Sequence, residues 1–189
     1  MSRTINRRGF LKGTLASAAL LVAGANLARA NKSGQKRAAN IEWFMPDEGE
    51  RHSRTWMAFG ASARIWGDHL LPLVQRNLAT LARTIAQYEP VSMLVRPRER
   101  SIAKGLLGDA RNVTLLDCPI DDLWIRDTGP TFLNNELNGL AAVDFNFNGW
   151  GRKQAHAQDA KVAAFIARQA KVDRLKADLV MEGGCIEVD

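Results

Sequence analysis

The run of residues 121–130, DDLWIRDTGP, holds three carboxylates, one guanidinium and one indole. Its closing Gly-Pro pair ends regular structure and favours a tight turn, so the run is typical of a functional loop. If the run is extended, Trp124 and Arg126 lie on one face and Asp127 on the other, where it stays free to bind a cation. A planar guanidinium suits a carboxylate beside an aromatic ring, through paired hydrogen bonds and stacking. The alternative is an ordinary turn beside a core tryptophan.

Three motifs in one order resemble the agmatine deiminase and bacterial, Porphyromonas-type peptidylarginine deiminase family. They are the run 121–130, FNFNGWGRK at 145–153 and MEGG at 181–184, and the likeness begins near MPDE at 45–48. The resemblance implies an enzyme that hydrolyses a guanidine to a urea with release of ammonia. Its substrate would be agmatine, giving N-carbamoylputrescine, or a peptidyl-arginine, giving citrulline. The implied fold is α/β, a partial, pentein-like α/β-propeller of strand–helix modules.

The resemblance also assigns roles to individual residues. Asp127 corresponds to the guanidinium-binding aspartate and is the candidate catalytic residue, and Trp124 corresponds to an aromatic wall of the same pocket. Glu182 and Trp150 match the E-G-G and F-N-x-W-G motifs as candidates for substrate contact. Asp121 is a further candidate for the pocket, with a solvated surface carboxylate as the equally open alternative.

Two neighbours of these residues are expected to support the site. Arg126 is expected to be structural, bridging to a loop carboxylate, and Asp122 to set the loop or the field at the mouth of the pocket. Around Trp150, the residues Asn148, Gly149 and Gly151 are expected to form a loop wall or to contact substrate.

Guanidine hydrolysis also needs a thiolate to attack the carbon and an imidazole to move protons. In the resembled family both groups lie beyond the E-G-G motif, in a considerably longer chain. Cys118 and Cys185 do not match the nucleophile and are expected to be buried, inert thiols, with a disulfide between them left open. No spacing typical of a metal or cofactor site occurs. The three histidines, His52, His69 and His156, match no motif, and we expect His52 and His156 to be surface groups.

The expectation is therefore an N-terminal fragment of a deiminase that is inactive alone. Two other functions stay open. One is a non-catalytic periplasmic remnant that binds guanidines or polyamines, and the other is a structural domain whose Asp-Trp loop is only a turn.

The first thirty residues have the features of an export signal. NRRGFLK at 6–12 is a twin-arginine motif, the apolar run 13–27 is too short to span a bilayer of about 30 Å, and ARA at 28–30 is a cleavage site. We expect cleavage after Ala30, a periplasmic or secreted product, the twin-arginine export machinery as a partner and no stable membrane anchor.

Removal of this segment changes the charge balance of the chain. The segment holds five of the 26 basic residues and no acid, so the net charge falls from +6 to +1. A nearly neutral chain does not indicate a nucleic-acid partner. The remaining residues suffice for one domain with a core. We expect 31–44 to be a flexible lead-in and 45–189 to be the truncated deiminase-like domain.

The spacing of apolar residues predicts the helices and strands that position the acidic run. Apolar residues three and four positions apart predict an amphipathic helix within 68–89, and a shorter helix is expected at 98–107. Buried strands are predicted at 55–60, 91–95 and 112–118. This order predicts a parallel sheet whose strands all end at the edge where the loop 121–130 lies and where ligands of α/β folds bind.

A second set of elements is expected after the loop. The predictions are a strand pair at 131–133 and 140–147, a helix at 159–170 and strands at 177–181 and 185–188. The last strand would lack a partner, which is the basis for expecting an incomplete module. An open α/β sheet would show the same pattern as part of a propeller.

Overall fold

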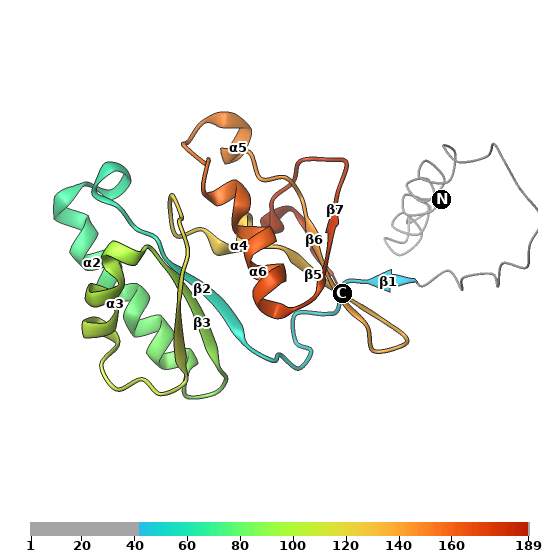
Figure 1. Cartoon of the computed structure of the whole chain (residues 1–189), viewed down its shortest axis with the longest axis horizontal. Helices are drawn as coiled ribbons and strands as arrows, with labels where there is room; N and C mark the ends of the chain where they lie inside the picture. Colours follow the sequence, from blue (N-terminus) through green and yellow to red (C-terminus); the bar gives the residue numbers. More distant parts are fainter. Residues whose placement is uncertain (1–41, 189) are drawn as a thin grey trace, which may run out of the picture. The chain divides into compact units, whose positions relative to one another are not determined.

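The computed structural model describes residues 42–188 (Figure 1). The expected export signal at 1–30 and most of the expected lead-in lie outside the described residues. The last residues of that lead-in, Trp43–Phe44, form strand β1. Among the described residues, no helix combines the length and the apolar character needed to cross a bilayer.

A parallel sheet carries the loop at its C-terminal edge. Its strands are β2 (Thr55–Phe59), β3 (Val91–Val95) and β4 (Val113–Asp117), in the order β2-β3-β4. Val95 pairs with Phe59 on one side and with Asp117 on the other, so the three strands end together. The predicted strands and their common edge are confirmed, and the loop 121–130 follows β4.

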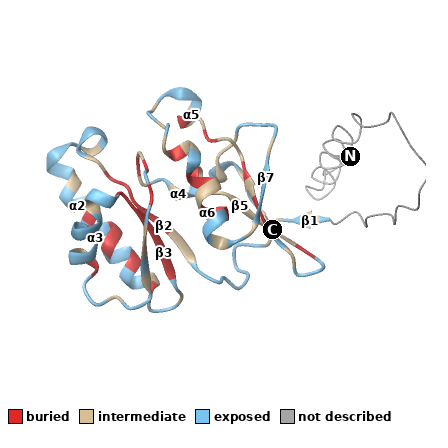
Figure 2. Cartoon of the chain, in the orientation of Figure 1, coloured by how far each residue is buried: buried red, intermediate tan, exposed pale blue. Residues whose placement is uncertain are grey.

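Helices cover both faces of this sheet, which explains why β3 is buried along its whole length (Figure 2). Helices α2 (Ala63–Ile85) and α3 (Arg100–Leu107) pack on one face, around Phe59, Met93, Ala82 and Leu107. On the other face, Val162 and Ile166 of α6 (Val162–Ala170) pack against Ala58 and Leu94. Burial of a side chain such as Phe59 contributes about 1.5–3 kcal/mol, so this core holds the loop-bearing edge in place.

Helix α2 begins earlier and ends earlier than the predicted helix within 68–89. It contains a break at Gly67, where φ is +68° and ψ is 161°, and Pro72 lies soon after this break. The predicted α3 is confirmed, although residues Pro97–Glu99 form a separate 3-10 turn, η1. The break leaves Trp66 on the short first turn of α2, from which its indole reaches the loop after β4.

A second sheet has the order β1-β5-β6-β7. Strands β5 (Thr131–Asn135) and β6 (Leu140–Asp144) form the predicted antiparallel pair, and β1 extends it beside β5. After the 3-10 turn η2 (Asp159–Lys161), α6 returns the chain to β7 (Asp173–Lys176), which pairs with β6 in parallel.

Two predicted strands near the end of the described chain are wrong. The strand expected at 177–181 lies instead at β7, whose four residues are all exposed at the sheet edge and mostly charged, so an apolar pattern could not reveal it. The strand expected at 185–188 is absent from the described residues, since Gly183–Cys185 form a 3-10 turn, η3, and irregular chain follows. A mixed α/β fold is nevertheless confirmed.

Candidate functional site

The acidic run contains one helical turn and is not extended, so the arrangement expected of an extended run does not apply. Ile125–Thr128 form α4 with Trp124 as the N-cap residue, and the main-chain N–H groups of Asp127 and Thr128 donate to the Trp124 carbonyl at 3.1 and 3.0 Å. Side chains therefore do not alternate between two faces, and the predicted separation of Trp124 from Asp127 by alternation is wrong. These local hydrogen bonds satisfy the main chain without a partner strand.

Asp122 is a buried carboxylate with three side-chain donors. Its Oδ1 accepts from Nε1 of Trp66 at 3.0 Å, and its Oδ2 accepts from Nε1 of Trp124 at 2.9 Å and from Nε2 of Gln154 at 3.2 Å. Only 2% of Asp122 is exposed. The prediction that Asp122 sets the loop agrees with these contacts.

Asp121 and Asp159 join the acidic loop to residues 158–159 through reciprocal hydrogen bonds. Asp121 Oδ2 accepts from the main-chain N–H groups of Gln158 and Asp159 at 2.7 and 3.2 Å. Asp159 accepts in return from Asp121 and Asp122 N–H groups, at 2.7 and 3.2 Å. Burial, and more weakly the charges of Asp121 and Asp122, raises the pKa of Asp159 to about 6 against the opposing effect of these hydrogen bonds. The substrate contact expected of Asp121 stays a prediction.

Asp127 differs from the other two carboxylates of the run. Its side chain receives no hydrogen bond and no salt bridge from any of the residues 42–188. It is half-buried and lines a small cavity of about 10 Å³, room for about one water molecule, together with Phe147 and Gly183. The carboxylate that the sequence singles out is thus the one that the described protein groups leave unsatisfied.

The E-G-G motif lies directly against this carboxylate. A Cβ on Gly183 would come within 2.2 Å of the Arg126 carbonyl oxygen, so only glycine allows the two backbones to approach so closely. A Cβ on Gly184 would lie 3.6 Å from Oδ1 of Asp127. Glu182, at the start of η3, is half-buried, and its Oε2 accepts from Sγ of Cys185 at 3.6 Å. The fold brings two of the three motifs together here.

Arg126 forms its salt bridge with a residue other than Asp127. Its Nη2 donates to Oε1 of Glu48 at 2.7 Å, and both side chains are more than half exposed. The expected bridge to a loop carboxylate is present, and it links the run to the MPDE motif. A hollow of about 480 Å³ lies beside this pair and shares Gly129 and Gly183 with the cavity at Asp127.

Four rings form what we call the aromatic wall: Trp66, Trp124, Trp150 and Phe147. Trp66 and Trp124 stack with centroids 6.2 Å apart and planes at 29°. Trp150 meets Trp124 edge to face at 6.4 Å and meets Phe147 in the same way at 5.0 Å. Because Phe147 also lines the cavity at Asp127, the wall continues into that cavity. Trp124 is 42% exposed, so its ring is available to a ligand.

The third motif holds Trp150 on an unusual backbone. Gly149, Trp150, Gly151 and Arg152 have φ values of 71°, 54°, 74° and 65°, and they form α5 (Gly149–Arg152). Main-chain hydrogen bonds of 2.9 Å run from Arg152 to Asn148 and from Lys153 to Gly149. This is one turn of left-handed helix, which costs a residue with a side chain about 1–2 kcal/mol. Such strain is found mostly at functional sites.

Comparison with known proteins accounts for this combination of motifs. The family model for Porphyromonas-type peptidyl-arginine deiminases matches residues 44–189. The chain belongs to this family. The motif order and the resemblance inferred from it are confirmed.

Relatives within the deiminase family agree over the same region. A Streptomyces coelicolor protein provisionally named an agmatine deiminase is 40% identical over 148 residues, covering 77% of this chain and 43% of the relative. The agmatine deiminase of Stutzerimonas stutzeri is 36% identical over 153 residues, covering 78% and 41%. The chain spans less than half the length of the curated relatives it matches.

Solved deiminase structures share the fold. The structure of the Enterococcus faecalis agmatine deiminase matches with a TM-score of 0.71 and 30% identity, over 78% of this chain and 41% of that one. A substrate-bound C315S agmatine deiminase of C. jejuni matches with a TM-score of 0.68 at 22% identity, over 84% and 45%, which shows the fold alone.

The two cysteines of this deiminase-family chain are not bridged and differ in environment. Cys118 is buried as predicted, and burial, with a contribution from the Asp159 charge, raises its pKa to about 11. Cys185 is exposed beside Glu182, so the prediction of a buried thiol is wrong there. The irregular chain after η3 provides no strand partner to cover it.

Among the described residues, no histidine forms a hydrogen bond with a cysteine. His52 is exposed and pairs with Glu89 at 3.3 Å, as expected of a surface group. His156 was also expected at the surface, but it is half-buried, with Nδ1 2.9 Å from the Gln154 carbonyl oxygen and its ring edge-on to Phe147. Residues 42–188 contain no group of three potential ligands that could hold a metal ion.

Sequence reasoning missed Arg96, which fixes the edge of the parallel sheet. Its guanidinium is buried and donates to the carbonyl oxygens of Gly60, Ala61 and Ile120 at 2.9, 2.6 and 3.0 Å. Glu99 balances its charge at 2.8 Å. An arginine directly after a buried strand was the available signal, but its acceptors lie 24 to 36 residues away.

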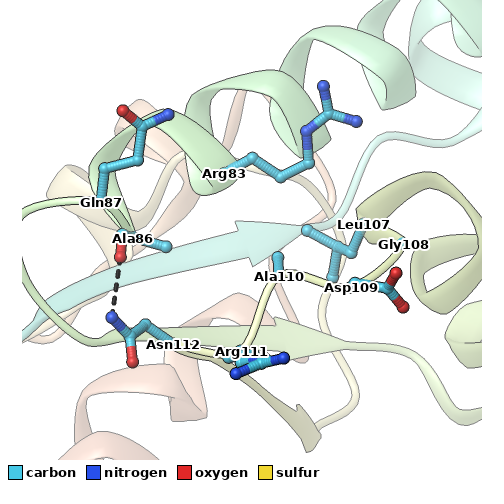
Figure 3. A pocket seen from close by; sticks show the side chains of 9 residues that line it. All are labelled: Arg83, Ala86, Gln87, Leu107, Gly108, Asp109, Ala110, Arg111 and Asn112. Atoms are coloured by element: carbon cyan, nitrogen blue, oxygen red, sulfur yellow. Dashed lines mark hydrogen bonds between the residues drawn. The ribbon is translucent and has the colours of Figure 1, made fainter.

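Another hollow, of about 430 Å³, lies at the opposite edge of the parallel sheet (Figure 3). Arg83 and Gln87 of the α2 region lie on one side, and Arg111 and Asn112, before β4, lie on the other. Asn112 donates to the Ala86 carbonyl at 2.9 Å. None of its lining residues belongs to the three motifs.

Proposed function

We propose that this chain supplies the guanidinium-binding part of an enzyme that hydrolyses a guanidine to a urea and ammonia, with Asp127 holding the cation. One observation carries the proposal. Asp122 accepts hydrogen bonds on both oxygens and Asp121 on one, whereas no donor among residues 42–188 reaches Asp127. A guanidinium has paired N–H groups that would satisfy both oxygens of this carboxylate.

The proposed reaction adds one water to the substrate and releases one ammonium ion, with cleavage of one C–N bond of the guanidinium and formation of the urea carbonyl. Asp127 would hold the cation and orient its carbon, while the aromatic wall would pack against the planar head group. The cavity at Asp127 must widen to admit a guanidinium, since its volume of about 10 Å³ holds about one water.

The thiol and imidazole of the reaction are proposed to lie outside the part of the protein described here. Cys118 is buried with a raised pKa, which disfavours the thiolate, and Cys185 does not match the family nucleophile. We therefore propose that residues 1–189 bind the guanidine without turning it over. This proposal extends to the fold, in which the strand–helix modules would form part of an α/β-propeller.

Agmatine is the substrate we propose first. Relatives with 36–40% identity carry the name agmatine deiminase, and a more distant one is described with its substrate bound. Peptidyl-arginine is the second candidate, and Glu182, Trp150 and Asp121 are retained as proposed substrate contacts.

The test is calorimetric titration of the 189-residue chain with agmatine, compared with Asp127→Asn. We expect binding by the original chain and a loss of at least about tenfold in affinity in the variant, because a charge-assisted hydrogen bond pair is lost. Asp109→Asn makes the same charge change at an exposed position and should bind normally. Equal affinity in all three proteins, or no heat at millimolar agmatine, contradicts the proposal.

A binding protein without catalysis is the second candidate. The unsatisfied Asp127 beside the aromatic wall suffices for binding, and neither described cysteine is placed as a nucleophile. The nucleotide sequence after the codon for Asp189 distinguishes the two. An in-frame H-x-D motif followed by a cysteine supports the enzyme, and a stop codon favours the binding protein.

We also propose export through the twin-arginine pathway, with cleavage after Ala30 and a periplasmic or secreted product. The basis is the sequence of residues 1–30 alone. Mass spectrometry of protein recovered from the periplasm should give an N-terminus at Asn31. Accumulation of the uncleaved chain in the cytoplasm contradicts this proposal.

A further inference from the structure

The carboxylate of Asp122 joins three segments that are distant in sequence. Its donors are Trp66 on the first turn of α2, Trp124 at the cap of α4 and Gln154, two residues after α5. The three contacts measure 3.0, 2.9 and 3.2 Å, and Asp122 is almost fully buried. A buried carboxylate is costly unless it is hydrogen-bonded, so these donors and this acceptor depend on one another.

Two of the three donors are rings of the aromatic wall. Trp66 and Trp124 bond to different oxygens of the same carboxylate, and this arrangement accompanies their stacking at 6.2 Å. Trp124 is an N-cap residue with 42% exposure, so the packing around its ring is incomplete. The hydrogen bond to Asp122 is therefore a principal restraint on the orientation of that ring.

Gln154 connects the same carboxylate to the segment that carries Trp150. The left-handed turn fixes the backbone of Trp150, and Gln154 N–H bonds back to the Gly149 carbonyl at 3.3 Å. The hydrogen bond from the Gln154 side chain to Asp122 then fixes this segment against the loop that holds Trp124. Trp150 reaches Trp124 edge to face as a result.

We propose that Asp122 is the positioning residue of the aromatic wall, orienting Trp124 and Trp150 for contact with the guanidine that Asp127 binds. The role in substrate contact rests on the proposed function, whereas the role in holding the rings does not. Asp122 itself makes no contact with substrate in this proposal.

Only a carboxylate meets the requirement at this position. Three N–H donors converge on two oxygens, and an aspartate offers acceptors on both. Asparagine keeps one oxygen but turns an NH₂ group toward at least one of the donors, leaving a buried donor unsatisfied. The Asp122→Asn variant therefore tests the hydrogen bonds while leaving the size of the side chain almost unchanged.

The first experiment observes the indole N–H groups in the ¹⁵N-labelled 189-residue chain by NMR, without ligand. In Asp122→Asn we expect the Nε1–H signals of Trp66 and Trp124 to shift and to exchange with solvent at least about tenfold faster, as for donors that lose a buried acceptor. The signals of Trp43 and Trp56 serve as internal references, and Asp109→Asn is the matched control. Unchanged Trp66 and Trp124 signals in a folded Asp122→Asn protein overturn the proposal.

The second experiment measures agmatine affinity in the same proteins. Asp122→Asn should bind at least about tenfold more weakly than Asp109→Asn, at temperatures where both are folded. If the original chain does not bind agmatine, the proposed function fails, while the NMR result still decides whether Asp122 holds the rings. If the rings are released and affinity is unchanged, the positioning role is overturned and the proposed function stands.

A less severe variant covers the case in which Asp122→Asn does not fold. Gln154→Met removes one donor of similar size and leaves both indoles bonded to Asp122. The Nε1–H signal of Trp150 should shift, because its segment loses the hydrogen bond to Asp122. The hydrogen bond from Trp66 to Asp122 should remain. A Trp150 signal identical to that of the original chain contradicts the proposal.

Discussion

Asp121 and Asp159 exchange hydrogen bonds, the carboxylate of each accepting the main-chain N–H of the other at 3.2 and 2.7 Å. The exchange ties the acidic loop to η2 at the start of α6. It also places a third carboxylate, that of Asp122, close enough for its charge to act on Asp159. The conformation of the acidic loop and the protonation of Asp159 are therefore coupled.

The free energy of unfolding should depend on pH through Asp159. Its pKa in the folded chain is raised from 3.8 to about 6, so the ionised form is disfavoured by folding. The stabilising contribution is complete below pH of about 4 and is lost as the pH rises through 6, by on the order of 3 kcal/mol. Urea unfolding between pH 4 and pH 7 measures this change.

Asp159→Asn provides the comparison for that measurement. It cannot ionise, so its unfolding free energy should fall less than that of the original chain over the same pH range. Parallel pH profiles for the two proteins would contradict the assignment of this pH dependence to Asp159.

Arg96→Lys should destabilise the fold. A lysine ammonium cannot reach the carbonyls of Gly60, Ala61 and Ile120 together, as the guanidinium does. We expect a loss of about 3 kcal/mol in urea unfolding, because buried acceptors lose their donors. Arg100→Lys, in an exposed pair with Asp117, should change stability by less than about 1 kcal/mol. Similar losses at both positions contradict this account.

Gly183→Ala should disturb the contact between the E-G-G turn and α4. The added methyl would meet the Arg126 carbonyl oxygen at 2.2 Å, and overpacking against backbone costs about 1–3 kcal/mol. Thermal unfolding should show a lower midpoint. Gly105→Ala in α3 meets nothing within 4 Å and should be neutral or stabilising. An unchanged midpoint in Gly183→Ala would show that the turn adjusts freely.

The two thiols should react at different rates with a disulfide reagent. Cys185 is exposed and should react in the folded chain, whereas Cys118 is buried with a pKa of about 11 and should react only after unfolding. Counting released chromophore in native buffer and in urea measures this. Reaction of both thiols in native buffer contradicts the burial of Cys118, and Cys185→Ser identifies the fast thiol.

The parallel sheet was predictable from the sequence because its strands are apolar and continuous, as Val91–Val95 shows. The edge strand Asp173–Lys176 was not, because its charged residues face solvent and its place is set by pairing with β6. The helical turn Ile125–Thr128 within the predicted loop could not be predicted, because a single helical turn leaves no periodicity to detect.

Some residues of the site could also be predicted from the sequence, although not all of their roles could. The order of the three motifs indicates the family and, through it, the guanidinium-binding role expected of Asp127. The pairing of Asp122 with Trp66 and Gln154, and of Asp121 with Asp159, could not be inferred, because the partners lie 32 to 56 residues apart along the chain. Long-range pairing of this kind depends on how the two sheets pack around α6.

The Arg96 contacts couple the motions of two segments at the edge of the parallel sheet. Because a single buried guanidinium donates to carbonyls of the segment after β2 and of the segment after β4, opening of either segment leaves it short of acceptors and weakens its hold on the other. Amide protons at 60–62 and 120–122 should then exchange with deuterium as one cooperative unit, with a shared opening free energy. The two walls of the sheet edge would loosen together rather than in turn.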